Sequence, residues 1–222
     1  MREPLAVIFD MDGVLVDSYQ PHWESWQRMA AEWGRGLSEA KFVQTFGRTS
    51  REIIAAHWGA AALTDAEMAE FDRQKESLYR EIVADNFPAM DGATELIRAL
   101  HAAGFRLAVG SSGPPENVAM AIDRLGVEPL FHTLVTGADV SRGKPDPQVF
   151  LTAAGRLGVP PARCAVIEDA PVGIAAANAA GMASIALLST GHTADSVTAA
   201  KVIVNSLREL SPDRIVELIS HG

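Results

Sequence analysis

The stretch that decides the fold is Phe9-Asp10-Met11-Asp12-Gly13-Val14-Leu15-Val16-Asp17-Ser18, which directly follows an apolar run at residues 5–9. That run is too short for a typical helix and rich in strand-forming residues, so it predicts a strand buried on both faces. Ligands of open α/β sheets bind just beyond the carboxyl ends of the strands, which is where Asp10 and Asp12 stand. Two carboxylates so close together repel each other unless a cation neutralises them. Gly13 allows the chain to turn sharply away from that cation site.

The composition is that of an ordinary soluble globular protein. The chain has 222 residues, 48% of them hydrophobic and 21% charged, which is enough for one or two domains. Its net charge of -9 argues against non-specific binding to nucleic acid or to an anionic membrane. The single cysteine, Cys164, excludes an intrachain disulfide. Neither a signal-peptide core nor a membrane span is recognisable, so we expect a cytoplasmic location.

Residues 21–86 contain no convincing strand and carry helix signals instead. Capping-box sequences begin at Thr49 and at Thr64, and the second of them opens a long helix. We therefore expect a separate, all-helical cap domain over residues 19–87. It is inserted into an α/β core formed by residues 1–18 and 88–222.

Strands and helices alternate in the predicted core after the insert. Strand-like runs occupy residues 105–110, 134–136, 164–167, 184–188 and 202–204. Asp91 stands where it would cap the first of the intervening helices. Repeated β–α units imply a parallel sheet with right-handed crossovers. The predicted fold class is therefore α/β, with a Rossmann-like parallel sheet core and an inserted all-helical cap.

Polar residues at four places near strand ends could together form a site for phosphoryl transfer. They are Asp10 with Asp12, Ser111, Lys144, and Glu168 with Asp169. Each has an ordinary explanation alone, because acids and serines cap turns and a loop lysine is usually solvated. Acids that leave a buried strand are costly unless they meet a cation, and hard oxygen ligands suit Mg²⁺ better than zinc. Taken together, the set predicts a metal-assisted phosphoryl-transfer site.

The order and spacing of these residues resemble the four motifs of the haloacid dehalogenase-like (HAD) phosphohydrolases along essentially the whole chain. The insert is similar to the helical cap of the subfamily of β-phosphoglucomutases and phosphoglycolate phosphatases. The resemblance implies that Asp10 attacks phosphorus and forms an aspartyl phosphate, while Asp12 acts as general acid and then general base. It also implies that Ser111 and Lys144 hold the phosphoryl oxygens.

The same resemblance implies a Mg²⁺ site. Its ligands would be the carboxylates of Asp10 and Asp169 and the backbone carbonyl of Asp12. Glu168 would be either a direct ligand or an outer-shell partner. Beside this site, the Ser111 hydroxyl and the amides that follow it, at Ser112 and Gly113, are predicted to bind the substrate's anion.

Three polar residues of the predicted cap resemble substrate-binding positions of β-phosphoglucomutases. Lys75 interrupts an apolar stripe, where it either snorkels to solvent or faces the substrate. Arg51, in the first turn after the Thr49 cap, suits a distal phosphate or carboxylate. His22 lies near the hinge, one turn before Trp26.

We therefore expect a Mg²⁺-dependent phosphatase acting on a small phosphorylated metabolite, such as a sugar phosphate or a phosphoglycolate-like acid. A β-phosphoglucomutase-type mutase is the alternative, but mutases carry a polar Ser-Lys-Asn run where this chain has Gly113-Pro114-Pro115. A phosphoaspartate signalling domain is a distant alternative, because such domains lack the helical cap and the second acid. The expected partner is the phosphorylated metabolite, without nucleic acid or membrane, and the expected state is a monomer or weak dimer.

Overall fold

The computed structural model of the protein describes residues 4–46, 48–189 and 192–220. The chain divides into two compact units, one comprising Met1–Asp17 and Ala89–Gly222 and the other Ser18–Pro88. We call them the α/β unit and the helical unit. Among the described residues, no helix is long and apolar enough to cross a membrane.

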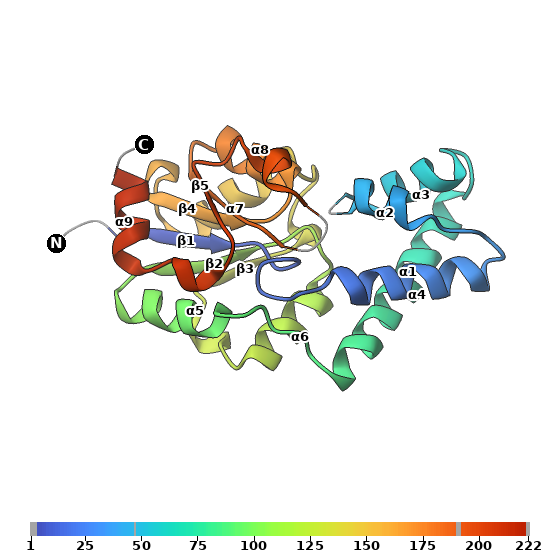
Figure 1. The fold of residues 1–222 in the computed structure, drawn as a ribbon, viewed down its shortest axis with the longest axis horizontal. Helices are drawn as coiled ribbons and strands as arrows, with labels where there is room; N and C mark the ends of the chain where they lie inside the picture. The colour runs from blue at the N-terminus through green and yellow to red at the C-terminus, as the bar shows by residue number, and fades with distance from the viewer. Residues whose placement is uncertain (1–3, 47, 190–191, 221–222) are drawn as a thin grey trace. The chain divides into compact units, whose positions relative to one another are not determined.

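The α/β unit is built on a six-stranded, parallel sheet with the order β3-β2-β1-β4-β5-β6 (Figure 1). The strands are β1 (Ala6–Phe9), β2 (Arg106–Gly110), β3 (Thr133–Val135), β4 (Cys164–Glu168), β5 (Ala183–Leu187) and β6 (Val202–Val204). The apolar run before Asp10 forms β1, which pairs with β2 on one side and β4 on the other and is wholly buried. The predicted strands and the parallel sheet are therefore confirmed.

Helices cover both faces of this sheet, with α5 and α6 on one side and α7 and α8 on the other (Figure 1). The helices are α5 (Ala93–Ala102), α6 (Pro115–Leu125), α7 (Gln148–Leu157), α8 (Pro171–Ala179) and α9 (Pro212–Ser220). Short 3₁₀ turns occur at η1 (Glu128–Leu130), η2 (Gly137–Asp139), η3 (Pro161–Arg163), η4 (Ala194–Val197) and η5 (Leu207–Glu209). A core cluster joins the small residues of α8 to Phe150 of α7 and Ile8 of β1. Burying apolar side chains on both faces fixes the sheet and therefore its carboxyl edge.

The predicted helix cap at Asp91 is wrong. The N-cap of α5 is Gly92, with φ 83°, and no side chain caps the helix. Asp91 instead accepts hydrogen bonds from Nε and Nη2 of Arg208, both at 2.7 Å. A Cβ at position 92 would lie 2.9 Å from the Arg208 side chain, so a glycine there permits both the left-handed turn and this ion pair.

The helical unit is the insert between β1 and the rest of the α/β unit. It consists of α1 (Tyr19–Glu32), α2 (Glu39–Thr45), α3 (Ser50–Trp58) and α4 (Asp65–Asp85). Both predicted capping boxes are confirmed, since Thr49 and Thr64 accept hydrogen bonds from the backbone amides of Glu52 and Glu67. The unit has its own aromatic core, in which Trp26 and Phe71 are fully buried.

Candidate active site

The loop after β1 positions the two acids of the first motif. The Asp10 amide donates to the carbonyl oxygen of Ile167 in β4 at 2.9 Å, so Asp10 still belongs to the strand ladder. The chain turns at Gly13, which has φ 74°, and the Gly13 amide donates to the Val16 carbonyl at 2.8 Å. A Cβ at position 13 would lie 1.9 Å from Oδ2 of Asp169. The motif therefore needs glycine both for its backbone conformation and because Asp169 approaches so closely.

Three buried carboxylates meet at this strand end. Asp10, Glu168 and Asp169 each offer one oxygen, and the three atoms lie within 4.8 Å of one another. The Lys144 ammonium donates to Oδ1 of Asp10 at 2.8 Å and to Oε1 of Glu168 at 2.7 Å. Lys144 supplies one positive charge against three carboxylates, so the cluster holds an excess of negative charge that a divalent cation would offset.

The protonation behaviour of these groups reflects that excess charge. Burial, together with the charges of Glu168 and Asp12, raises the pKa of Asp10 to about 7, although Lys144 acts in the opposite direction. Burial and the neighbouring carboxylates Glu168 and Asp10 also raise the pKa of Asp169. Burial alone would lower the pKa of Lys144, but its two acidic partners outweigh burial and the net shift is upward. Added positive charge is therefore what would keep Asp10 and Asp169 ionised.

The donor set fits a hard divalent cation. All three groups offer carboxylate oxygens, which are the ligands that Mg²⁺ and Ca²⁺ prefer. Both oxygens of Glu168 already have partners, because Oε1 accepts from Lys144 and Oε2 accepts from the Ala170 amide at 2.7 Å. Asp10 and Asp169 are thus the better candidates for direct ligands, and Glu168 for an outer-shell partner.

The loop after β2 brings the predicted anion-binding residues towards Asp12. Ser111 is 1% exposed, and its hydroxyl accepts the Gly113 amide at 2.9 Å. A Cβ on Gly113 would lie 3.2 Å from the Ser111 hydroxyl and 3.8 Å from Oδ2 of Asp12. Ser112 is exposed, and α6 begins at Pro115 with the positive end of its dipole at this loop. The Gly113 amide, which was predicted to bind the anion, is thus used within the loop. The Ser111 hydroxyl and the start of α6 remain suited to an anion beside Asp12.

One residue that contacts the acid cluster lies outside the four motifs predicted from the sequence. Ser189 lies two residues beyond β5, and its hydroxyl donates to Oδ2 of Asp169 at 2.6 Å. Its position just past the carboxyl end of a strand is the sequence signal that marks it.

In the helical unit, the structure brings Lys75 and His22 together. The buried Lys75 ammonium lies 2.9 Å from Nδ1 of His22 and 2.7 Å from Oε1 of Glu76. Because an ammonium group only donates, Nδ1 of His22 accepts here. The His22 ring stacks on Tyr79 with their centroids 3.9 Å apart. The snorkelling explanation of Lys75 is therefore wrong, since its charge is held among these partners and not in solvent.

Arg51 lies at the amino end of α3 and pairs with Asp65 at 2.7 Å. Both side chains are mainly exposed, so the pair adds little stability. Asp72 of α4 lies within electrostatic range of Lys75 and Arg51, and burial raises its pKa. Each cation predicted to bind substrate is thus accompanied by an acid.

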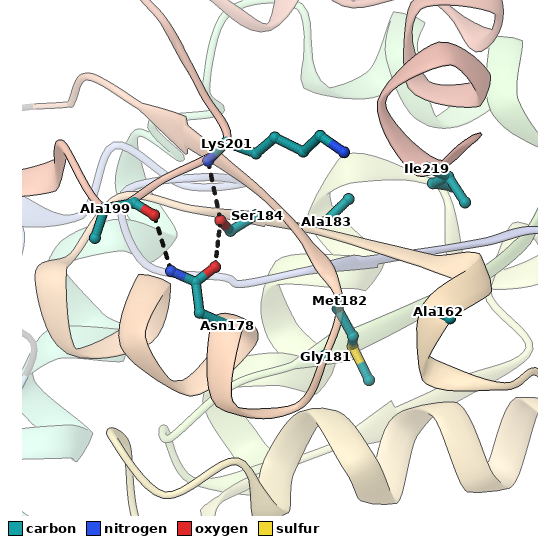
Figure 2. Close-up of a pocket in the computed structure, with 9 residues that line it drawn as sticks. All are labelled: Ala162, Asn178, Gly181, Met182, Ala183, Ser184, Ala199, Lys201 and Ile219. Carbon is teal, nitrogen blue, oxygen red and sulfur yellow. Dashed lines mark hydrogen bonds between the residues drawn. The ribbon is translucent and has the colours of Figure 1, made fainter. Parts of the chain in front are cut away.

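A separate cavity of about 470 Å³ lies near the amino ends of β5 and β6 (Figure 2). Its polar groups bind one another: Asn178 donates to the Ala199 carbonyl, Ser184 donates to Asn178, and the Lys201 amide donates to Ser184. Of the residues that line it, none is an acid or a histidine. The acids of the candidate site stand at the opposite ends of the strands, so this cavity is not part of it.

Comparisons with known proteins agree with this arrangement. Residues 4–181 match the model of the family described as haloacid dehalogenase-like hydrolase. The chain is 34% identical to validoxylamine A 7'-phosphate phosphatase of Streptomyces hygroscopicus subsp. limoneus, over 92% of this chain and 95% of that protein. It is also 34% identical to the β-phosphoglucomutase of Bacillus subtilis, over 81% of each chain.

The fold has solved counterparts. The crystal structure of a HAD hydrolase, family IA, variant 3, from Entamoeba histolytica superposes with a TM-score of 0.87 at 27% identity, covering 97% of this chain and 99% of that one. The family match over most of the chain, the shared fold and the buried acid cluster at the sheet edge all agree. The chain belongs to the haloacid dehalogenase-like hydrolases, in the branch related to β-phosphoglucomutases and sugar-phosphate phosphatases.

Proposed function

We propose that this protein is a Mg²⁺-dependent phosphatase that hydrolyses a small phosphorylated metabolite through an aspartyl phosphate on Asp10. The observation that carries the proposal is the pairing of Lys144 with both Asp10 and Glu168 beside Asp169. This arrangement gives a carboxylate nucleophile, a fixed cation and an excess of carboxylates that a second cation would offset. The relationship to a phosphorylated carbohydrates phosphatase of Thermotoga maritima, at 32% identity over 81% of this chain and 83% of that protein, supports a sugar phosphate as the substrate.

In the first half of the proposed reaction, an oxygen of Asp10 attacks phosphorus while the bond to the leaving oxygen breaks. Asp12 gives its proton to that oxygen, so the alcohol departs neutral. In the second half, Asp12 takes a proton from water, whose oxygen attacks the phosphorus of phospho-Asp10 while the bond from phosphorus to the Asp10 oxygen breaks, so that phosphate and the Asp10 carboxylate are released. Lys144 and Ser111 hold the phosphoryl oxygens. A bound Mg²⁺ would supply further positive charge for the phosphoryl oxygens and keep Asp10 ionised.

A mutase function is the second candidate, because the Bacillus subtilis relative carries that name. Both activities would share phospho-Asp10 and differ in whether water or a second substrate hydroxyl receives the phosphoryl group. The proline pair at the start of α6 favours hydrolysis, because it replaces polar side chains that would hold a sugar phosphate for return transfer. A phosphatase releases phosphate continuously, whereas a mutase does so only as a slow leak.

The proposal is tested by measuring phosphate release from a panel of sugar phosphates, alditol phosphates and phosphoglycolate with the purified protein. We expect continuous release from at least one sugar or alditol phosphate in Mg²⁺. Chelation with excess EDTA should stop the reaction, and added Mg²⁺ should restore it. Release that survives exhaustive chelation would show that the metal assignment is wrong.

Asp169→Ala should raise the Mg²⁺ concentration needed for half-maximal activity. Because a hard ligand is lost, the increase should exceed the roughly 10- to 100-fold typical of outer-shell partners. Titrating activity with Mg²⁺ measures this change. Asp195→Ala, which removes an exposed acid elsewhere in the α/β unit, is the control and should leave the requirement unchanged.

We further propose that Arg51, Lys75 and His22 of the helical unit contact the part of the substrate that does not react. Lys75→Met and Arg51→Ala should then lower kcat/KM for the preferred metabolite more than for a small aryl phosphate. A hydrogen bond to a charged group is worth about 1.5–3 kcal/mol, which corresponds to about 10- to 100-fold in rate. Lost remote contacts also lower turnover when they help to drive closure of the site.

The matched control for these variants is Arg73→Ala, which removes an exposed cation from the same helix as Lys75. It should leave both activities near wild type. If neither Lys75→Met nor Arg51→Ala changes the ratio of the two activities, specificity resides in other residues.

A further inference from the structure

We propose that Ser189 is a positioning residue for the metal site, where its hydroxyl holds one oxygen of Asp169 so that the other faces the cation. The inference rests on the metal requirement of the proposed function. The Ser189 hydroxyl donates a hydrogen bond to Oδ2 of Asp169 at 2.6 Å. The same oxygen lies against the backbone at Gly13, where a Cβ would come within 1.9 Å of it. Oδ2 is therefore confined by the Gly13 backbone and the Ser189 hydroxyl.

Asp169 needs such a restraint more than its neighbours do. Glu168 is fixed at both oxygens by Lys144 and the Ala170 amide, and Asp10 is fixed by Lys144. For Asp169, the bond from Ser189 is the one side-chain hydrogen bond found within the described ranges 4–46, 48–189 and 192–220. The terminal torsion of an aspartate is broad, so a carboxylate without a partner would rotate and present its oxygens less consistently.

Ser189 is itself well placed by the sheet. The amide of the preceding residue, Leu188, donates to the Val204 carbonyl at 2.8 Å, which continues the pairing of β5 with β6 by one step. The backbone is thus held directly before the serine, and the hydroxyl reaches across to the end of β4. A partner that orients a metal ligand in this way typically contributes about 10- to 100-fold to metal affinity.

The test compares Ser189→Ala with the wild type by calorimetric titration of Mg²⁺ and by the electron paramagnetic resonance signal of bound Mn²⁺, both without substrate. We expect Ser189→Ala to bind either ion roughly 10-fold more weakly. At saturating Mg²⁺ its kcat should return close to that of the wild type. Ser189→Thr keeps the hydroxyl and should restore affinity. Ser196→Ala removes an exposed hydroxyl from the same region and should change nothing.

Thermal unfolding in EDTA separates positioning from a structural role. Ser189→Ala should unfold at nearly the wild-type temperature there and show a smaller rise when Mg²⁺ is added. Wild-type Mg²⁺ affinity in Ser189→Ala would overturn the inference, and so would equal loss of affinity in Ser189→Thr. Because the titrations need no substrate, the inference stands if metal affinity falls as expected in a protein that releases no phosphate. In that case it is the proposed phosphatase function that fails.

Discussion

Asp10→Asn should abolish phosphate release, lowering kcat by roughly 10³-fold or more. Asparagine has the size of aspartate but lacks its charge and basicity, so it cannot attack phosphorus to form an acyl phosphate. The change also removes one of the two carboxylates that hold Lys144, while Glu168 keeps the other contact at 2.7 Å. Steady-state phosphate release measures the loss. Acid-quenching the enzyme with radiolabelled substrate shows whether a phosphoenzyme forms, and Asp10→Asn should trap none.

Asp17→Asn is the matched control, because Asp17 is an exposed acid in the same motif. It should keep most of the activity, which separates the loss of the nucleophile from a general loss of negative charge at the loop. Thermal unfolding of both variants checks that each is folded. Near-wild-type release by Asp10→Asn would remove Asp10 from the mechanism.

The strands were predictable from the sequence because the apolar runs are too short for helices and rich in strand-forming residues, as expected for strands buried on both faces of a parallel sheet. The run before Asp10 forms β1 at the centre of the sheet, as expected. The capping boxes at Thr49 and Thr64 were equally predictable, since both partners in each box lie within three residues of each other. The prediction that Asp91 caps a helix was wrong because its side chain binds Arg208 instead. Arg208 is more than a hundred residues away in the sequence, so no local pattern indicates this contact.

The site was predictable to the extent that topology alone brings its parts together. All strands of a parallel sheet present their carboxyl ends at one edge, so acids after β1 and β4 had to approach each other. Which oxygen of Glu168 meets Lys144 depends on side-chain packing, and the sequence does not encode it in any short pattern. The bond from Ser189 to Asp169 depends on where β5 ends relative to β4, which only the assembled sheet determines.

The contacts of Lys75 were likewise not predictable from local sequence patterns. Helical spacing places it on an apolar stripe, and from that alone snorkelling was a reasonable explanation. Its actual partners include His22, which comes from another helix 53 residues away in the sequence. A buried charge is stable only with such a partner, and the identity of that partner is a tertiary property.

Asp12→Ala should separate two kinds of substrate by their leaving groups. The alkoxide of an alkyl phosphate is a poor leaving group and needs a proton as the P–O bond breaks, so losing the general acid should slow formation of phospho-Asp10 by roughly 10²- to 10⁴-fold. The phenolate of an activated aryl phosphate departs without a proton, so formation of phospho-Asp10 from that substrate should be slowed much less. The second half-reaction needs Asp12 as a base with either substrate, so phosphoenzyme should accumulate from the aryl phosphate. Rapid acid quenching with labelled substrates measures both the formation and the decay of phospho-Asp10.

Alanine at position 12 removes the side-chain carboxylate but retains the backbone carbonyl, which is the predicted metal ligand. The variant therefore separates loss of the general acid from loss of the metal. Mg²⁺ affinity should therefore remain close to that of the wild type, and a calorimetric titration of the variant is the control. The substitution removes only the half-buried carboxylate side chain beside the Ser111 loop. Equal slowing of phosphoenzyme formation with the alkyl and the aryl substrate would contradict the role of Asp12 as general acid. Rapid decay of phospho-Asp10 in the variant would contradict its role as general base.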